Sequence, residues 1–510
     1  MGTTIGIDLG TTYSAIAFIN KDGKAEIIPN REGERITPSV VLFDDDDEPL
    51  VGSIAKQSAS SSPLDTVQFA KRRMGEALII YSTESGKDYT PEDISAIILK
   101  RLKEDAETAL GETITDAVVS VPAYFDDAQR KATQHAGDIA GLNILRIINE
   151  PTAAALAYGI ENNERPETVL VYDLGGGTFD VTIMKVDANG VTVLATGGNR
   201  ILGGFDWDNA LMEYLNEEFK KQTEHDLFDD PACIERLRSS AEKTKKSLSS
   251  RNSTKVFISE GGQNISIKVT LELFNEITRP LLNRTGGIMN LVLEDAQLQW
   301  SNIDKILLVG GSTRMKCVAE FVEETTGIKP SIELHPDEIV AMGAAVQASM
   351  INNEENGKIE AVQKMGLLPV QVKDVNAHSL GTIILDENTG IEKNDIAIKK
   401  DTLLPAETSK VYHTVDDNQT SIHIRITQGE SDIPRDVTTI GESIAQIEEH
   451  PKGAPFRFNY QYDLNGLIQI TVFDLTTNKH VEKIEIRRVA NLNRSDIQSK
   501  QKRMSNTVVN

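Results

Sequence analysis

Two short segments of this chain are near-copies of each other, and each has the pattern of a strand, a tight glycine turn and a second strand. Residues 7–12 read IDLGTT, and residues 172–178 read YDLGGGT. An apolar run precedes each copy and another follows it, as expected for paired strands. A single turn of this kind is weak evidence, but two matched copies predict two related lobes that each contribute one hairpin.

The residue types in these turns suit a phosphate-binding site. Glycine lets backbone N–H groups approach a phosphate closely, and threonine adds a hydroxyl donor. Asp8 and Asp173 stand just before the turns, where a carboxylate would repel a phosphate unless a divalent cation lay between them. The pattern therefore predicts a nucleotide clamped between the two lobes.

Charge and composition exclude several other classes of protein. The 510 residues carry a net charge of −24, which argues against nucleic acid and anionic membrane surfaces as partners. Cys233 and Cys317 form no C-x-x-C pair, so we expect neither a disulfide framework nor a zinc ribbon. The sequence has no signal-peptide pattern and no apolar run of about 18 residues, so we expect a cytoplasmic protein without a membrane span.

Strand-like and helical stretches alternate over residues 1–355, which predicts a mixed α/β domain. The expected elements are strands at 117–121 and 306–309, helices at 126–141 and 150–160, a small-residue helix around 343–347, a glycine turn at 310–314 and a polar loop at 352–358. Asp126 is the expected cap of its helix. The glycine turn precedes a helix and so predicts another anion site.

The pattern changes after residue 355. Residues 356–375 are expected to be a linker region, and residues 376–490 show the alternation of apolar and polar residues that predicts an all-β sandwich. Residues 491–510 remain as a C-terminal helix and tail. This segment is polar and basic, so we expect a frayed helix that cannot bury a face alone.

Taken together, these motifs resemble those of the heat shock protein 70 (DnaK-type) chaperone family, and the resemblance extends over essentially all of the chain. The motifs that carry the resemblance are residues 7–12, 148–159, 173–180, 308–315, 336–338 and 343–348. The resemblance implies an α/β actin-like two-lobed ATPase domain followed by an all-β sandwich that binds peptides. It also implies an ATP-dependent chaperone that binds extended apolar segments of unfolded proteins and couples their affinity to ATP hydrolysis.

The resemblance also implies roles for individual residues around ATP or ADP and Mg²⁺. Lys71 would face the γ-phosphate and the attacking water, and Asp8, Glu150 and Asp173 would hold Mg²⁺ through its waters. Glu150 precedes a proline and is expected to lie outside a regular helix. The residues expected at the phosphates are Gly10, Thr11, Thr12, Tyr13, Gly175, Gly176, Gly177 and Thr178, the last grouped with the catalytic residues. The residues expected at the adenosine are Glu242, Lys245, Lys246, Ser249, Gly311, Ser312, Arg314 and Asp337.

Two further sets follow from the resemblance. The expected peptide crevice consists of Thr382, Leu385, Tyr412, Val415, Ile422, Ile424 and Phe456. The residues expected to couple nucleotide to linker are Pro122, Arg130, Arg146 and Asp374, with Arg146 meeting Asp374 when the linker docks. From the residues alone, Ile422 and Ile424 share one strand face, which sandwich core would explain equally well. The implied partners are unfolded polypeptides, a J-domain co-chaperone and a nucleotide exchange factor.

The chain departs from the family pattern in three places. The stretch from Lys71 to Pro122 is short, so contacts with an exchange factor are in doubt. The linker reads VQVKD at residues 370–374 in place of a leucine run, which predicts weaker coupling. Of the helical lid only residues 492–504 are expected, without the acidic tail motif of the family.

Two other functions remain open from sequence. One is an actin-fold phosphotransferase such as a sugar kinase, which would need a catalytic base and a sugar pocket and would not need a terminal sandwich. The other is a nucleotide-gated, non-catalytic co-chaperone or exchange protein. The presence of Lys71, Asp173 and Thr178 argues against that second possibility.

Overall fold

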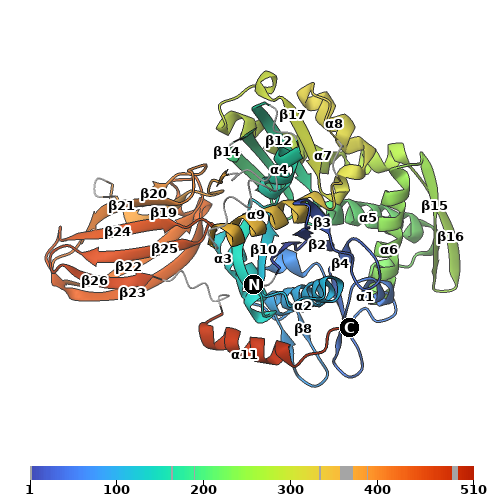
Figure 1. Cartoon of the computed structure of the whole chain (residues 1–510), viewed down its shortest axis with the longest axis horizontal. Helices are drawn as coiled ribbons and strands as arrows, with labels where there is room; N and C mark the ends of the chain where they lie inside the picture. The colour runs from blue at the N-terminus through green and yellow to red at the C-terminus, as the bar shows by residue number, and fades with distance from the viewer. Residues whose placement is uncertain are drawn as a thin grey trace.

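The computed structural model describes residues 3–161, 165–188, 190–331, 335–355, 371–386, 389–484 and 492–510. Figure 1 shows two lobes built on α/β sheets, an all-β unit attached at one side, and a C-terminal helix that returns to the first lobe. The two lobes are called lobe one and lobe two below, and the all-β unit is called the sandwich.

Lobe one is built on a sheet with the strand order β11-β10-β1-β2-β3, with β4 paired to β2. The central strand β1 runs antiparallel to β2 and parallel to β10, so that Ile7 lies opposite Ile16 on one side and Val119 on the other. The strands are β1 (Ile5–Asp8), β2 (Tyr13–Ile19), β3 (Ala25–Ile27), β4 (Thr37–Pro38), β10 (Asp116–Val121) and β11 (Asn143–Asn149).

Lobe two repeats this arrangement with the strand order β17-β12-β13-β14-β18. Its strand β12 is again antiparallel to the next strand, β13, and parallel to a strand far along the chain, β17. The strands are β12 (Glu167–Leu174), β13 (Phe179–Asp187), β14 (Gly190–Asn199), β17 (Lys305–Val309) and β18 (Gln371–Lys373). The two related lobes predicted from the twin motifs are therefore present.

Smaller sheets and ten described helices complete the lobes and the C-terminus. The additional strands are β5 (Val40–Phe43), β6 (Pro49–Val51), β7 (Thr66–Gln68), β8 (Tyr81–Ser82), β9 (Asp88–Tyr89), β15 (Ser253–Glu260) and β16 (Gln263–Thr270). The helices are α1 (Ser53–Ser58), α2 (Pro91–Leu110), α3 (Asp127–Ile139), α4 (Glu150–Glu161), α5 (Gly204–Thr223), α6 (Pro231–Leu248), α7 (Leu271–Asp295), α8 (Lys316–Thr326), α9 (Ile339–Glu355) and α11 (Arg494–Ser505). Short 3₁₀ turns are η1 (Ala70–Arg73), η2 (Leu227–Asp229), η3 (Trp300–Asn302), η4 (Gly311–Arg314) and η5 (Pro434–Asp436).

Two of these helices differ from the sequence predictions. Glu150 was expected outside a regular helix, but it is the first residue of α4, because proline is well accommodated in the first turn of a helix. The predicted loop at 352–358 is wrong for its first part, since α9 continues to Glu355, and the rest of that stretch lies outside the described residues. The capped helix predicted at 126–141 is confirmed as α3, with Asp126 accepting a bond from the backbone of Gln129.

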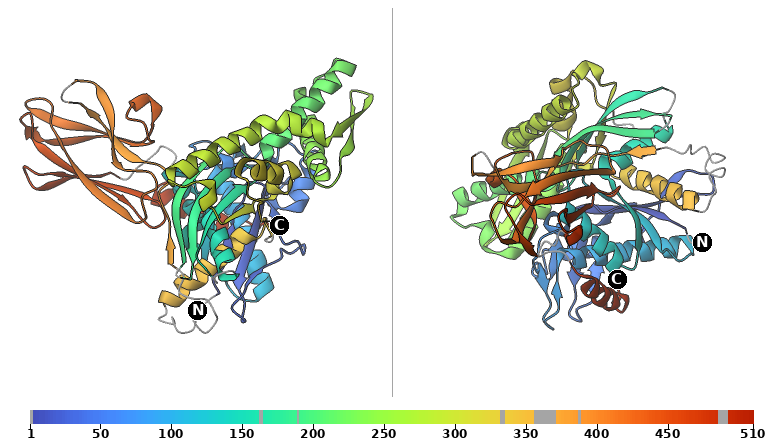
Figure 2. Two further views of the ribbon diagram at one scale, coloured as in Figure 1. Left: turned by 90° about the horizontal axis from the view of Figure 1, so that it is seen from above. Right: turned by 90° about the vertical axis from the view of Figure 1, so that its left-hand side faces the viewer.

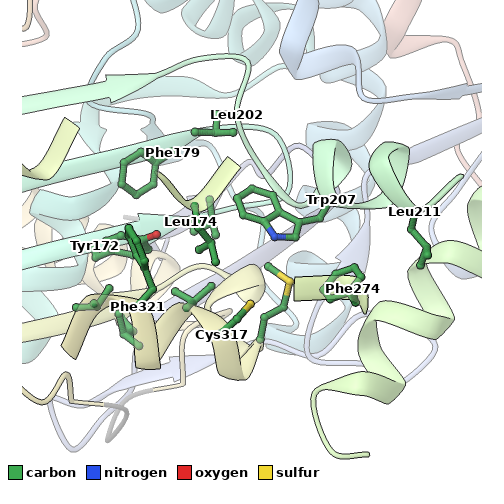
Figure 3. Packing of buried hydrophobic residues seen from close by; sticks show 14 of the residues in the cluster. Tyr172, Leu174, Phe179, Leu202, Trp207, Leu211, Phe274, Cys317 and Phe321 are labelled. Atoms are coloured by element: carbon green, nitrogen blue, oxygen red, sulfur yellow. The ribbon is translucent and has the colours of Figure 1, made fainter. Parts of the chain in front are cut away.

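Close packing of small residues joins the lobes around α9. A Cβ added to Gly343 would lie 1.8 Å from the carbonyl oxygen of Ala153 in α4, and one added to Gly6 would lie 2.0 Å from the nitrogen of Ala345. The backbone of α9 therefore approaches α4 and strand β1 at distances that only glycine allows. In lobe two, Figure 3 shows Trp207 beside Leu174, with Phe179 and Phe274 on opposite sides of them, in one buried cluster.

The sandwich consists of two four-stranded sheets, with strand orders β20-β19-β22-β23 and β21-β24-β25-β26. Side chains from both sheets, including Ile426 and Tyr460, share one core. The strands are β19 (Leu380–Leu385), β20 (Glu392–Ile398), β21 (Ala406–His413), β22 (Gln419–Gln428), β23 (Thr438–His450), β24 (Pro455–Tyr462), β25 (Ile468–Asp474) and β26 (Lys479–Ile484).

Both ends of the sandwich are connected to elements that pack on the lobes (Figure 2). Before it, β18 pairs in parallel with β14, where Val372 lies opposite Val191. After it, α11 packs on lobe one, where Met504 and Val509 are buried in the lobe-one core. The C-terminal segment was expected to be unable to bury a face alone, and it buries Met504 and Val509 against an apolar surface that lobe one supplies. Among the described helices, none combines the length and apolar character needed to cross a membrane.

Candidate functional site

The two glycine hairpins meet face to face between the lobes. A Cβ added to Gly176 would lie 2.3 Å from the hydroxyl oxygen of Thr12, and one added to Gly177 would lie 2.6 Å from that of Thr11. Within the first hairpin, a Cβ on Gly10 would lie 1.9 Å from the carbonyl oxygen of Tyr13. Larger residues would force the hairpins apart, so the glycines allow the two turns to close on one another.

The hairpins are also fixed from outside the motifs. In lobe one, the Ser39 hydroxyl donates to the carbonyl of Gly10 at 2.8 Å. In lobe two, the carbonyl of Gly175 accepts bonds from the Ser312 hydroxyl at 2.9 Å and the Gly204 backbone N–H at 2.9 Å. The glycine turn at 310–314 thus supports the second hairpin directly.

Four carboxylates lie at the hairpins; Asp8 is half-buried and the other three are buried. Asp8 ends β1, Asp173 lies in β12, Glu150 begins α4 and Asp180 lies in β13. Burial, with Glu150 as the next cause, raises the pKa of Asp8 to about 7 and that of Asp173 well above its usual range. The same two causes raise the pKa of Asp180 to about 7. Buried carboxylates that repel one another require a cation to be ionised together.

Lys71 provides one positive charge at this group. It lies in η1 with 6% of its side chain exposed, and its Nζ bonds to a Glu150 carboxylate oxygen at 2.5 Å. The ammonium therefore reaches the carboxylate group from lobe one, in the region where the sequence predicted a catalytic lysine.

The donor set fits a hydrated Mg²⁺ ion. Carboxylate oxygens are the ligands that Mg²⁺ prefers, and the ion usually keeps several waters. Among the described residues, the only three-residue group with its ligand atoms within 4.8 Å of one another is Asp230, Cys233 and Glu260. Asp8, Glu150 and Asp173 do not form such a group.

The residues predicted at the adenosine separate into two groups. Glu242 forms ion pairs with Lys56 at 2.8 Å and Lys246 at 2.7 Å, and both lysines bond to the Tyr13 hydroxyl. Burial opposes ionisation of Glu242, but the two lysines outweigh it and lower its pKa to about 2. Lys245 instead bonds to Asp208 at 2.7 Å and to the Gly204 carbonyl, so its ammonium supports the start of α5.

In the second group, Arg314 pairs with Asp337 at 2.6 Å, and a Cβ added to Gly311 would lie 2.5 Å from the Asp337 carboxylate. Ser249 follows the last residue of α6, and its hydroxyl donates to the Lys245 carbonyl at 3.4 Å. The turn at Gly311 and the end of α6 thus belong to the same lobe as the second hairpin.

The predicted coupling residues converge where β18 reaches the sandwich. Arg130 is buried and donates to the side-chain oxygen of Asn149 at 2.7 Å and to the carbonyl of Asn465 at 3.3 Å. Asp374 accepts from the Asn149 amide at 2.8 Å and the Thr152 hydroxyl at 3.1 Å.

The other two predicted coupling residues are Arg146 and Pro122. Arg146 was expected to meet Asp374. The bonds described for this carboxylate come from Asn149, Thr152 and the backbone N–H of Val375, and the contact with Arg146 stays a prediction. Pro122 directly follows β10, and its carbonyl accepts from Phe125. Residue 370 and the rest of 356–370 lie outside the described residues.

Sequence reasoning missed the contacts that the sandwich makes on the lobes. The Asn465 side chain accepts from the backbone N–H of Ile147 at 3.2 Å, and Asp127 accepts from that of Ile468 at 2.8 Å. Farther along the interface, Lys400 pairs with Asp295 at 2.6 Å. The Asn-Gly turn at 465–466 was visible in the sequence, but its pattern marks only a turn and not a docking contact.

The predicted peptide crevice divides between core and surface. Thr382, Ile424 and Phe456 are buried, and the last two belong to the sandwich core, so they support the sheet and are not open to a peptide. Leu385 and Val415 are 44% and 39% exposed. The remaining two, Tyr412 and Ile422, are half-buried and pack against the core.

Comparisons with known proteins agree with this architecture. The family model described as Hsp70 protein matches residues 4–509. The chaperone proteins DnaK of Thermotoga petrophila and Thermotoga maritima are each 42% identical to the chain over 484 residues, which cover 93% of this chain and 79% of each relative. The DnaK protein of Thermotoga neapolitana shows the same identity and coverage.

Proposed function

The chain belongs to the Hsp70 protein family, and on that premise we propose that the site between its lobes binds ATP with Mg²⁺ and hydrolyses it. The protein is an ATP-dependent molecular chaperone and an ATPase. The observation that carries the proposal is the pair of facing Gly-Thr hairpins, with half-buried Asp8 and buried Asp173 just before the turns.

In this proposal the hairpin glycines and threonines bind the phosphates by backbone and hydroxyl donors, and Lys71 orients the attacking water. Phosphoryl transfer depends mainly on positioning and charge neutralisation. Mg²⁺, when bound, would neutralise phosphate charge, and Asp8, Glu150 and Asp173 would hold its waters. The group at Tyr13 and Glu242, together with the turn at Gly311, would enclose the adenosine.

We also propose that residues 1–355 form an actin-like ATPase domain, 356–375 the linker region, 376–490 the peptide-binding sandwich and 491–510 a C-terminal segment. Unfolded polypeptides are its substrates, and the exposed Leu385 and Val415 are the strongest crevice candidates. A J-domain co-chaperone and a nucleotide exchange factor are the proposed partners. A cytoplasmic location stays a prediction.

The decisive experiment is single-turnover ATP hydrolysis by a Lys71→Ala variant. We expect hydrolysis to fall at least a hundredfold while ATP still binds, because the backbone contacts of the hairpins remain. Lys21→Ala removes an exposed lysine and is the matched control. Hydrolysis by Lys71→Ala within a few-fold of the unmodified protein would refute the catalytic assignment. Slow hydrolysis by the unmodified protein with tight nucleotide binding would support a nucleotide-gated binding protein instead.

A further inference from the structure

Five side chains join the two lobes beside Lys71, and the chemistry proposed above uses none of them. We call this group the cross-lobe clasp. It consists of Phe69 and Arg72 from lobe one and Phe205, Asp206 and Arg238 from lobe two, all half-buried. Phe69 lies between β7 and η1, two residues before Lys71, while Phe205 and Asp206 lie in the first turn of α5 and Arg238 lies in α6.

The clasp combines aromatic, cationic and ionic contacts. The rings of Phe69 and Phe205 meet edge to face with centroids 4.6 Å apart. The guanidinium of Arg72 lies 4.5 Å from the Phe205 ring, and that of Arg238 lies 4.9 Å from Phe205 and 5.5 Å from Phe69. Arg72 also pairs with Asp206 at 3.3 Å. Each type of contact is individually favourable, and separation of the lobes at this point would break all of the contacts that cross between them.

The backbone of Phe69 shows that this segment is held from outside. Its φ of 61° and ψ of 24° place it in the left-handed region, which bulky residues rarely adopt unless their surroundings impose it. The contacts described for its ring come from lobe two. Because η1 begins at the next residue, the conformation that points Lys71 at Glu150 depends on a contact with the opposite lobe.

The other half of the clasp is attached to the second phosphate hairpin. The backbone N–H of Phe205 donates to the carbonyl of Gly176 at 2.8 Å, and that of Gly204 donates to the carbonyl of Gly175 at 2.9 Å. The first turn of α5 therefore moves with the hairpin. A continuous path leads from the hairpin through Phe205 and Phe69 to the segment that carries Lys71.

We propose that the clasp is a closure sensor: it positions Lys71 for hydrolysis only while the lobes are closed, and it must open before nucleotide leaves. Its members act through Lys71 and through lobe separation, so they are positioning residues and do not contact the nucleotide. The proposal rests on the proposed role of Lys71 in ATP hydrolysis. It predicts that one set of contacts limits nucleotide release and supports hydrolysis.

The test measures release of fluorescent ADP and single-turnover hydrolysis at saturating ATP. Phe205→Ala removes the aromatic pair and two cation contacts, and we expect release about tenfold faster and hydrolysis several-fold slower. Phe69→Asn should give the same result, because asparagine tolerates the left-handed backbone but has no ring. Phe205→Tyr keeps the ring and should restore both rates. Phe257→Ala removes a phenylalanine that is 73% exposed on β15 and is the matched control.

The double variant Phe69→Asn/Phe205→Ala separates a coupled clasp from two local defects. The two changes should be non-additive, since each removes the same contact. Release and hydrolysis within twofold of the unmodified protein in both single variants, or fully additive effects, would overturn the proposal. Lys71→Ala keeps the clasp and tests the catalytic assignment separately; normal hydrolysis by that variant would refute the catalytic assignment and leave the release measurement to decide the clasp.

Discussion

Replacement of Asp374 by alanine is predicted to uncouple the sandwich from the lobes. The buried carboxylate accepts from the Asn149 amide at 2.8 Å and from the Thr152 hydroxyl at 3.1 Å. Asn149 in turn accepts from Arg130, which bonds to the carbonyl of Asn465 in the sandwich. Asp374 therefore lies where lobe one, β18 and the sandwich meet, and its loss should weaken the contacts among all three.

The magnitude follows from the two donors outside the Asp374 segment, Asn149 and Thr152, that alanine leaves without an acceptor; the backbone N–H of Val375 also loses its bond to this carboxylate. A buried polar group without its partner costs about 1–3 kcal/mol, so the docked state should lose roughly 2–6 kcal/mol. Each 1.4 kcal/mol is tenfold, which lowers the ratio of docked to undocked molecules roughly 30-fold to 20,000-fold. Coupling between sites is typically worth about 1–3 kcal/mol, so this change is large enough to make the undocked state the major one.

Two measurements check the prediction. Hydrogen exchange of the β18 amides with ATP bound should lose its protection, and stimulation of the ATPase by an apolar peptide should fall to the basal rate. Asp374→Asn keeps one acceptor oxygen and should be intermediate, while Asp416→Ala removes an exposed carboxylate of the sandwich and should change neither. Protection and stimulation of Asp374→Ala both within twofold of the unmodified protein would show that these buried bonds do not maintain docking.

Three more outcomes are expected. Gly190→Ala should release β18 and accelerate the hydrogen exchange of this strand, because Gly190 has a φ of 142° and an added Cβ would lie 2.0 Å from the Gln371 carbonyl oxygen. Gly33→Ala, with a φ of 79° and no neighbour within 4 Å, is the control for backbone strain alone. Burial, followed by the charge of Glu150, raises the pKa of Asp180 to about 7. The nucleotide-free protein should therefore lose stability as the pH rises from about 4 through 7. In urea unfolding at pH 8, the Asp180→Asn variant should be more stable than the unmodified protein. Met504→Ala removes a buried side chain of the C-terminal segment and should detach α11 at a loss of about 2–5 kcal/mol, measured as faster hydrogen exchange of the α11 amides. Val508→Ala changes a 56% exposed position and should have little effect. Unchanged exchange in Met504→Ala would contradict the prediction.

Local sequence patterns predicted much of the architecture. The twin motifs predicted two related lobes because a strand, a glycine turn and a second strand are encoded within a few neighbouring residues. The cap at Asp126 and the strands of the sandwich follow from equally local signals. The interlocked contact of Gly176 with Thr12 could not be predicted in the same way, since it joins residues of different lobes.

Contacts between distant parts of the chain also decide the surroundings of several predicted residues. A polar C-terminal segment has no apolar face of its own, but Met504 and Val509 are buried because lobe one offers a complementary surface. Ile424 and Phe456 are apolar, as residues of a peptide crevice or of a sandwich core would be, and only the arrangement of the two sheets assigns them to the core. Lys245 has the charge expected at a nucleotide, but Asp208 lies close enough to pair with it.

The attachment of chain segments on both sides of the sandwich limits how far it can travel. Seven residues, 485–491, separate the end of β26 from Leu492, and a chain of that length spans at most about 25 Å. While α11 stays on lobe one, this short segment tethers a sandwich that has lost its β18 contacts. The sandwich then meets its docking surface again at an effective concentration in the millimolar range, so redocking is independent of how much protein the solution contains.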